Sequence, residues 1–206
     1  MPIGKSQPLH HSILHALLLK TKAEKRLFIG IPIGCKIQTL LADIKSSILT
    51  NSEYIKWTSL ENIHLTLSFL GNVFVDDIPN LTQTLDDLLH LAHFKVSIEK
   101  TGVFPSIQSP KTLWMGVCNT NGKLIELHKL IENEIASFKV LRKKEGFIPH
   151  ITIGKTTRSY GKIDVLPFLK YVYSPRELDI NSVALYESKL LPDGAEYKVL
   201  TEFPLN

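Results

Sequence analysis

The chain has 206 residues, 44% hydrophobic and 21% charged, which is ordinary for a soluble globular protein and allows a sizeable core without disulfides or metals as staples. Its net charge of +4 permits an anionic partner but does not require one. No stretch has the ~18 uninterrupted apolar residues of a membrane span, and two cysteines without a metal motif, Cys35 and Cys118, favour a reduced, cytoplasmic location.

The first predicted element is a buried strand at 26–32, R-L-F-I-G-I-P, which ends at a proline. Residues 1–25 are predicted to be an N-terminal extension, because their apolar run is short, interrupted by histidines and without a signal-peptide cleavage pattern. The later elements follow from helical or strand-like spacing of apolar residues. The predicted helices are 34–49, 76–93 and 124–135. The predicted strands are 53–57, 62–71, 95–104, 111–118, 149–155, 178–187 and 195–203, with a loop at 105–110 and turns at 119–122 and 192–194.

These elements predict an α+β fold rather than a doubly wound parallel sheet. Several adjacent strands are joined by short turns and do not alternate regularly with helices, which favours antiparallel pairing. No glycine-rich phosphate loop follows a strand, so the common nucleotide-fold motifs are absent. Residues 26–206 are therefore expected to form one domain.

The stretch N-I-H-L-T-L-S-F-L-G, residues 62–71, carries polar residues in an apolar strand. Simple alternation puts His64, Thr66 and Ser68 on one face and apolar residues up to Phe69 on the other. The apolar face is a core face. The polar face is either plainly exposed to solvent or the wall of a cleft.

A second stretch, P-H-I-T-I-G-K at 149–155, repeats the H-x-T spacing with His150 and Thr152. Residues two apart on a strand share a face, so each strand presents an imidazole and a hydroxyl together. Two such strands across a cleft suit chemistry on one phosphoryl group. One histidine removes a proton, the other protonates the leaving oxygen, and the hydroxyls bind the phosphate oxygens.

Seven stretches match the motifs of a known family in order and spacing. They are 26–32, 61–71, 102–106, 111–117, 147–155, 185–190 and 197–200. On these stretches the chain resembles the two-histidine (2H) phosphoesterases, and within them the bacterial and archaeal RNA 2′,3′-cyclic phosphodiesterases, historically called 2′-5′ RNA ligases.

The resemblance implies a bilobal α+β fold with two antiparallel-rich sheets, pseudo-twofold symmetry, helices on the outer faces and a central cleft. It implies hydrolysis of RNA 2′,3′-cyclic phosphate ends to 2′-phosphates, without metal or other cofactor. By position, His64 would donate the proton to the leaving oxygen and His150 would accept the proton of water. Thr66 and Thr152 would bind the phosphate.

Two lysines are weaker candidates for phosphate contacts. Lys155 stands where many members have arginine, and simple alternation puts it on the face opposite His150 unless the strand breaks at Gly154. Lys111 matches a basic position beside the cleft in relatives. The basic segment 139–162 is either a solvated loop or a rim that attracts phosphate.

Other functions are compatible with the same residues. The site would also serve 2′-5′ RNA ligation or cleavage, or another cyclic phosphate such as ADP-ribose 1″,2″-cyclic phosphate. A nucleotide- or RNA-binding module without chemistry is a further alternative. The expected partners are RNA 3′ ends or nucleotide cyclic phosphates, with no membrane and no obligate protein partner, and the expected state is a monomer. One of Trp57, Trp114 and Tyr186 is a candidate for stacking on a base.

Overall fold

The structure is a computed structural model. It describes residues 23–47, 52–118, 121–138, 146–157, 163–192 and 194–206. The predicted N-terminal extension, apart from its last residues, and half of the basic segment 139–162 (139–145 and 158–162) lie outside the described residues, so neither prediction is tested.

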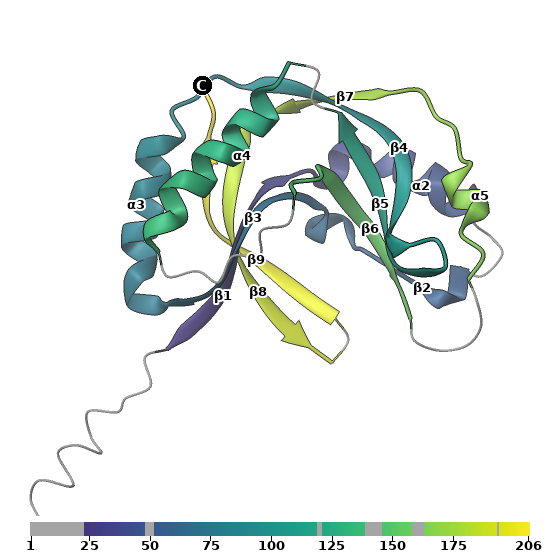
Figure 1. The fold of residues 1–206 in the computed structure, drawn as a ribbon, viewed down its shortest axis with the longest axis horizontal. Helices are drawn as coiled ribbons and strands as arrows, with labels where there is room; N and C mark the ends of the chain where they lie inside the picture. Colours follow the sequence, from purple (N-terminus) through teal and green to yellow (C-terminus); the bar gives the residue numbers. More distant parts are fainter. Residues whose placement is uncertain (1–22, 48–51, 119–120, 139–145, 158–162, 193) are drawn as a thin grey trace, which may run out of the picture.

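Antiparallel strands dominate the described chain, and four α-helices accompany them (Figure 1). The helices are α2 (Gln38–Ser47), α3 (Ile78–Leu88), α4 (Lys123–Glu134) and α5 (Leu166–Leu169). The strands are β1 (Glu24–Pro32), β2 (Ile55–Trp57), β3 (His64–Phe74), β4 (Phe94–Ser106), β5 (Ser109–Cys118), β6 (His150–Thr156), β7 (Arg176–Ile180), β8 (Ser182–Leu191) and β9 (Gly194–Pro204). The predicted α+β class with antiparallel pairing is confirmed.

The strands form one continuous sheet in the order β7-β4-β5-β6-β3-β1-β8-β9, with β2 attached to β6. The resemblance implied two sheets, but the structure has one, whose two halves are β7-β4-β5-β6 with β2 and β3-β1-β8-β9. They join through one residue pair, Leu65 on β3 and Ile151 on β6. In Figure 1, α3 and α4 cover one half, and α2 and α5 lie beside the other. The central strands β3 and β6 are the two that carry the H-x-T motifs.

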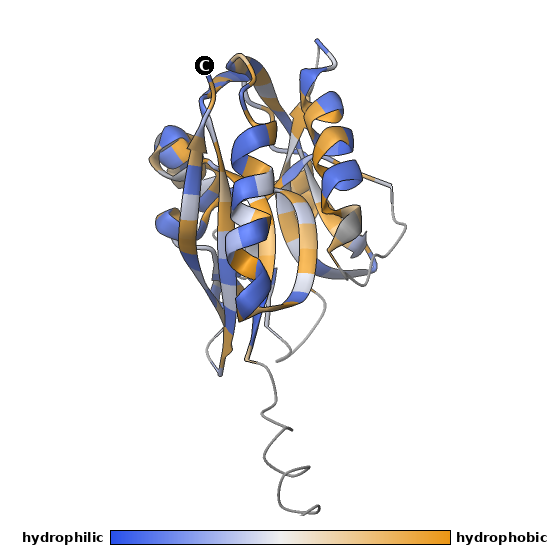
Figure 2. Cartoon of the chain, turned by 90° about the vertical axis from the view of Figure 1, so that its left-hand side faces the viewer, coloured by the Kyte–Doolittle hydropathy of each residue, from blue (hydrophilic) through white to orange (hydrophobic). Residues whose placement is uncertain are grey.

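The helices are amphipathic, and in the coloured view of Figure 2 hydrophilic and hydrophobic residues alternate along the helix ribbons. In α4 the buried residues are Leu124, Leu127 and Ile131, spaced by three and four positions so that they share one face. They close over the apolar face of β3, where Leu65 is fully buried. Removing this apolar surface from water stabilises the arrangement by roughly 25 cal/mol per Å². Within the described residues, no helix is long and apolar enough to cross a membrane.

Three predicted boundaries are wrong. The helix expected at 76–93 begins at Ile78 and ends at Leu88. The loop expected at 105–110 is mostly strand, because β4 and β5 form a hairpin in which Pro105 pairs with Pro110. Proline lacks the N–H of a regular ladder, and these two lie at the irregular end of the hairpin where fewer donors are needed. The single strand expected at 178–187 is two strands, β7 and β8, separated by Asn181.

Candidate active site

The two H-x-T motifs lie side by side in the middle of the sheet. His64 is the first residue of β3 and His150 the first of β6. The strands are antiparallel around the pair Leu65 and Ile151, so the register puts His64 beside Thr152 and Thr66 beside His150. Leu65 and Ile151 are both fully buried on the core side. The four polar side chains therefore share the opposite face, called the H-x-T face below.

Both histidines are held by the same backbone contact. Nδ1 of His64 lies 2.7 Å from the carbonyl oxygen of Asn62, and Nδ1 of His150 lies 2.7 Å from that of Ile148. A carbonyl oxygen only accepts, so Nδ1 of each ring carries the proton and donates. Nε2 of each ring is left to exchange a proton with a substrate, which is the arrangement that general acid–base catalysis needs.

His64 is packed among aromatic rings. Its ring centroid lies 4.7 Å from that of Phe28, 5.0 Å from that of Tyr197 and 5.5 Å from that of Tyr186. Burial, followed by the nearby charges of His150 and Lys155, lowers the pKa of His64 to about 4. The ring is therefore neutral in the free protein at neutral pH.

His150 has an aromatic environment of its own. Its ring meets Phe104 edge-on, with centroids 5.0 Å apart, and lies 6.1 Å from Trp114. Trp114 in turn lies against Gly102 of β4, where an added Cβ would collide with the indole ring. The absence of a side chain at Gly102 thus makes room for the indole that borders His150.

A bulge in β3 changes the expected alternation after Thr66. Thr66 and Phe69 are three apart on β3, but they pair with Gly30 and Phe28, which are two apart on β1. Ser68 is consequently buried, with 5% of its surface exposed, whereas Phe69 is 65% exposed. The predictions that Ser68 accompanies Thr66 and that Phe69 faces the core are wrong. Phe69 joins the H-x-T face instead.

Helix α4 holds this bulge from the core side. Nδ1 of His128 donates to the carbonyl oxygen of Leu67 at 2.9 Å, and the hydroxyl of Ser68 donates to Glu132. The His128 ring also stacks on Phe147, with centroids 4.0 Å apart and planes 13° from parallel. Because Phe147 leads into β6, this one histidine touches the chain next to both H-x-T motifs.

The same kind of bulge occurs in β6. Thr152 and Lys155 are three apart, but they pair with Trp114 and Thr112, which are two apart on β5. Opposite residues of an antiparallel pair point to the same side, so Lys155 shares the H-x-T face with Thr152. The sequence left open whether the strand breaks at Gly154 and so turns Lys155 to the face of His150. This bulge is that break. Lys155 occupies in its half the place that Phe69 occupies in the other.

Comparison with known proteins identifies the family. Residues 35–190 match the 2′-5′ RNA ligase superfamily. The chain belongs to this superfamily. An RNA 2′,3′-cyclic phosphodiesterase of Thermotoga maritima is 32% identical over 178 residues, covering 86% of this chain and 94% of that protein. One of Aquifex aeolicus is 30% identical over 154 residues, covering 73% and 81%.

Solved structures support the same fold. The protein TT0787 of Thermus thermophilus superposes with a TM-score of 0.72 at 21% identity, covering 87% of this chain and 97% of that one. Escherichia coli LigT complexed with 3′-AMP gives a TM-score of 0.71 at 20% identity, covering 89% and 99%. At these identities the likeness concerns the fold alone, which is that of a 2H phosphoesterase.

In this superfamily member, the structure brings five of the six candidate residues together: His64, Thr66, His150, Thr152 and Lys155. It does not bring Lys111 to them. Lys111 precedes Thr112, which occupies the H-x-T face, and it falls at an irregularity where it has no partner on β4. Sequence reasoning missed Phe69 as part of this face. It had named Trp114 and Tyr186, which border His150 and His64, but not the other rings beside the histidines, which are Phe28, Phe104 and Tyr197. The signal available was that H-x-T is followed three positions later by Phe in one copy and Lys in the other.

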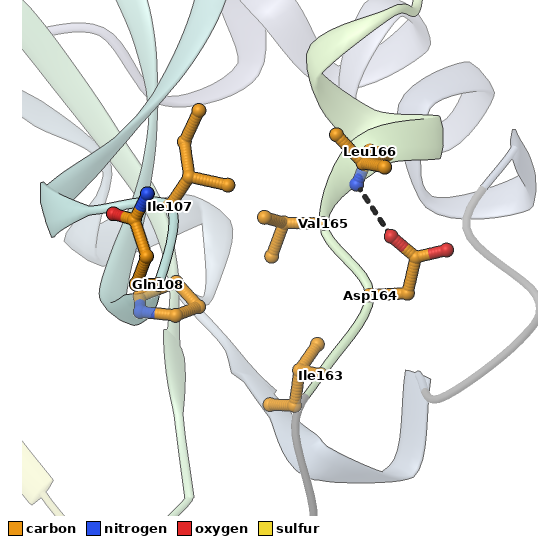
Figure 3. Close-up of a pocket in the computed structure, with 7 residues that line it drawn as sticks. Ile107, Gln108, Ile163, Asp164, Val165 and Leu166 are labelled. Carbon is orange, nitrogen blue, oxygen red and sulfur yellow. Dashed lines mark hydrogen bonds between the residues drawn. The ribbon is translucent and has the colours of Figure 1, made fainter.

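A second feature of the protein, an open pocket, is separate from this site (Figure 3). It is lined by Ile107, Gln108, Pro110, Ile163, Asp164, Val165 and Leu166. Asp164 accepts a hydrogen bond from the backbone N–H of Leu166 at 2.9 Å. The carbonyl of Pro110 accepts a hydrogen bond from Thr156, the last residue of β6. The pocket therefore lies at the end of β6 opposite His150, and we assign it no part in the chemistry.

Proposed function

We propose that this protein hydrolyses RNA ends bearing a 2′,3′-cyclic phosphate to 2′-phosphates by two-histidine acid–base catalysis. The observation that carries the proposal is the antiparallel meeting of β3 and β6, which puts two imidazoles and two hydroxyls on one face. Relatives that this chain matches over most of its length are named RNA 2′,3′-cyclic phosphodiesterases. No metal is part of the proposed reaction, because the two imidazoles supply both proton transfers.

In the proposed reaction, Nε2 of His150 takes a proton from water as the water oxygen attacks phosphorus. The bond from phosphorus to O3′ breaks, and protonated His64 gives its Nε2 proton to O3′. The phosphate then remains on O2′. Thr66 and Thr152 donate hydrogen bonds to the non-bridging oxygens, and the ammonium of Lys155 offsets the charge that grows there.

The donor role of His64 requires it to be protonated in the complex. Burial lowers its pKa to about 4 in the free protein. An anionic phosphate placed against the ring favours the charged form, so substrate binding raises this pKa. An imidazolium held against its burial penalty is a strong acid, which suits transfer of its proton to an alkoxide leaving group.

The exposed ring of Phe69 gives the terminal base a surface to stack on. Phe69 is opposite Phe28 on β1, and Phe28 is opposite Tyr186 on β8, with their rings stacked 4.7 Å apart. The buried ring of Phe28 packs beneath Phe69, with their centroids 6.0 Å apart. Stacking on an aromatic ring is tolerant of base identity and is worth about 1–3 kcal/mol per base.

The decisive experiment incubates purified protein, in excess chelator, with a nucleoside 2′,3′-cyclic phosphate and identifies the product by chromatography against 2′- and 3′-phosphate standards. We expect the 2′-phosphate from the wild type, and no turnover from folded His64→Ala or His150→Ala. His90→Ala, at an exposed position away from β3 and β6, is the matched control. A folded wild type that binds the nucleotide without opening any cyclic phosphate would instead indicate a binding module.

A further inference from the structure

Two lysines lie directly opposite each other on the H-x-T face. Lys56 of β2 pairs with Lys155 of β6, and both side chains are exposed. Like charges directly opposite on neighbouring strands destabilise a sheet. Within the described residues, neither lysine forms an ion pair with a carboxylate. The fold therefore retains two adjacent positive charges that no described acidic residue compensates.

The register fixes which face these lysines occupy. The bulge in β6 puts Lys155 on the side of Thr152, and residues opposite each other share a side, so Lys56 follows. The charge of Lys155 contributes to the lowered pKa of His64, which places that charge near the reacting groups. Lys56 lies on β2, which pairs with the same edge of β6 as β3 does, so Lys56 stands between Lys155 and the other half of the sheet. Its Nζ is 3.4 Å from where a Cβ on Gly194 would lie, so it reaches the β8–β9 hairpin of the other half.

The two positive charges of Lys56 and Lys155 outnumber the negative charge of the reacting cyclic phosphate. A 2′,3′-cyclic phosphodiester carries one negative charge, and Lys155 already serves it together with the two threonines. In an RNA strand the next negative charge is the phosphodiester on O5′ of the same nucleotide, one ribose away. A second lysine beside the first matches this second phosphate.

We propose that Lys56 binds the phosphodiester linking the terminal nucleotide to the rest of the RNA, so that the protein prefers oligonucleotide ends over cyclic mononucleotides. This inference rests on the proposed function and names its substrate class. Lys56 contacts no reacting atom and acts as a specificity-determining residue. The competing explanation is that Lys56 only protects a short strand from pairing with other chains, as lysines on edge strands do.

The test compares two substrates, a nucleoside 2′,3′-cyclic phosphate and a dinucleotide ending in the same cyclic nucleotide. The readout is the ratio of their kcat/KM values in wild type, Lys56→Gln and Lys189→Gln. Lys189 is exposed on β8, three positions after Tyr186 and so on the side away from His64, and its loss changes the net charge equally. Because hydrogen bonds between an ammonium and a phosphate are among the stronger polar contacts, we expect Lys56→Gln to lower the dinucleotide preference at least about tenfold.

Two further measurements sharpen the result. Lys56→Arg should retain most of the preference, because arginine also binds phosphate. The slope of log kcat/KM against log salt for the dinucleotide should fall by about 0.7 in Lys56→Gln, the contribution of one single-strand phosphate contact. Thermal melts of all variants confirm that each is folded.

A wild type with no preference for the dinucleotide overturns the inference, and so does an unchanged preference in Lys56→Gln. An equal loss of kcat/KM on both substrates in Lys56→Gln overturns it too. Such a result would mean that Lys56 acts on the reacting phosphate or supports the fold. If the wild type opens neither substrate, the proposed function fails rather than the inference about Lys56. These results are distinguishable in one set of assays.

Discussion

The burial of His64 makes the stability of the free protein depend on pH in a predictable direction. Its pKa is about 4 in the folded protein against an ordinary value of 6.5. Between these values the unfolded chain binds a proton that the folded protein does not, so stability rises with pH. The contribution of neutral His64 to the free energy of unfolding is fully present above the pKa of His64 in the unfolded chain. It is lost as the pH falls toward the pKa of His64 in the folded protein.

The magnitude follows from the two pKa values. Their difference corresponds to about 3 kcal/mol once the pH is below both, at about 1.4 kcal/mol per pH unit. Between about pH 7.5 and about pH 5, linkage gives a loss of about 2 kcal/mol. The ring is partly exposed on the H-x-T face, so screening by solvent makes this an upper limit.

Urea denaturation of wild type and His64→Gln at these two pH values measures the effect. Glutamine does not titrate, so the pH dependence of His64→Gln should be smaller than that of the wild type by up to about 2 kcal/mol. Titrating groups that do not interact with His64 cancel in this difference. His90→Gln, at an exposed site, should behave like the wild type. Equal pH dependence in wild type and His64→Gln would refute the claim that burial governs the protonation of His64.

Substitutions at three other positions probe the supports of the site. Gly102→Ala puts a Cβ into the space of the Trp114 ring, which must move from the border of His150, so kcat and the melting temperature should both fall. His128→Ala should destabilise the protein by about 1–3 kcal/mol in urea by leaving the carbonyl of Leu67 unpaired, whereas His128→Asn, which keeps a donor, should recover part of the loss. Phe69→Ala should raise KM for a cyclic nucleotide about tenfold or more, with kcat less affected, in steady-state assays. An unchanged KM would show that the base does not stack on Phe69.

The placement of each histidine with its threonine was predictable because it depends on short, local spacing. H-x-T on a strand puts His64 with Thr66, and His150 with Thr152, whatever the rest of the chain does. The family resemblance then supplied the fold that brings the two strands together. The antiparallel class was also readable, since short turns join adjacent strands.

The orientation of residues beyond each threonine was not predictable, because it depends on pairing with distant strands. The bulge before Phe69 is a mismatch in register with β1, and the bulge before Lys155 is one with β5. A rule in which side chains strictly alternate between the two faces of a strand cannot represent such a bulge. Ser68 is buried because Glu132, 64 residues later, accepts its hydrogen bond. The adjacency of Lys56 and Lys155 depends on strand pairing in the same way.

The two halves of the site thus share a backbone design and differ in side chains. Each has H-x-T, a ring nitrogen tied to a carbonyl two residues earlier, and a bulge that turns the residue three positions after threonine to the same face. That residue is the apolar Phe69 in one half and the charged Lys155 in the other. A nucleotide with a phosphate at the centre of this face has an apolar base and an anionic strand to accommodate. In the proposed mechanism, this near-symmetric frame with one aromatic and one basic extension selects a single orientation of an asymmetric ligand, and that orientation would assign the acid role to His64 and the base role to His150.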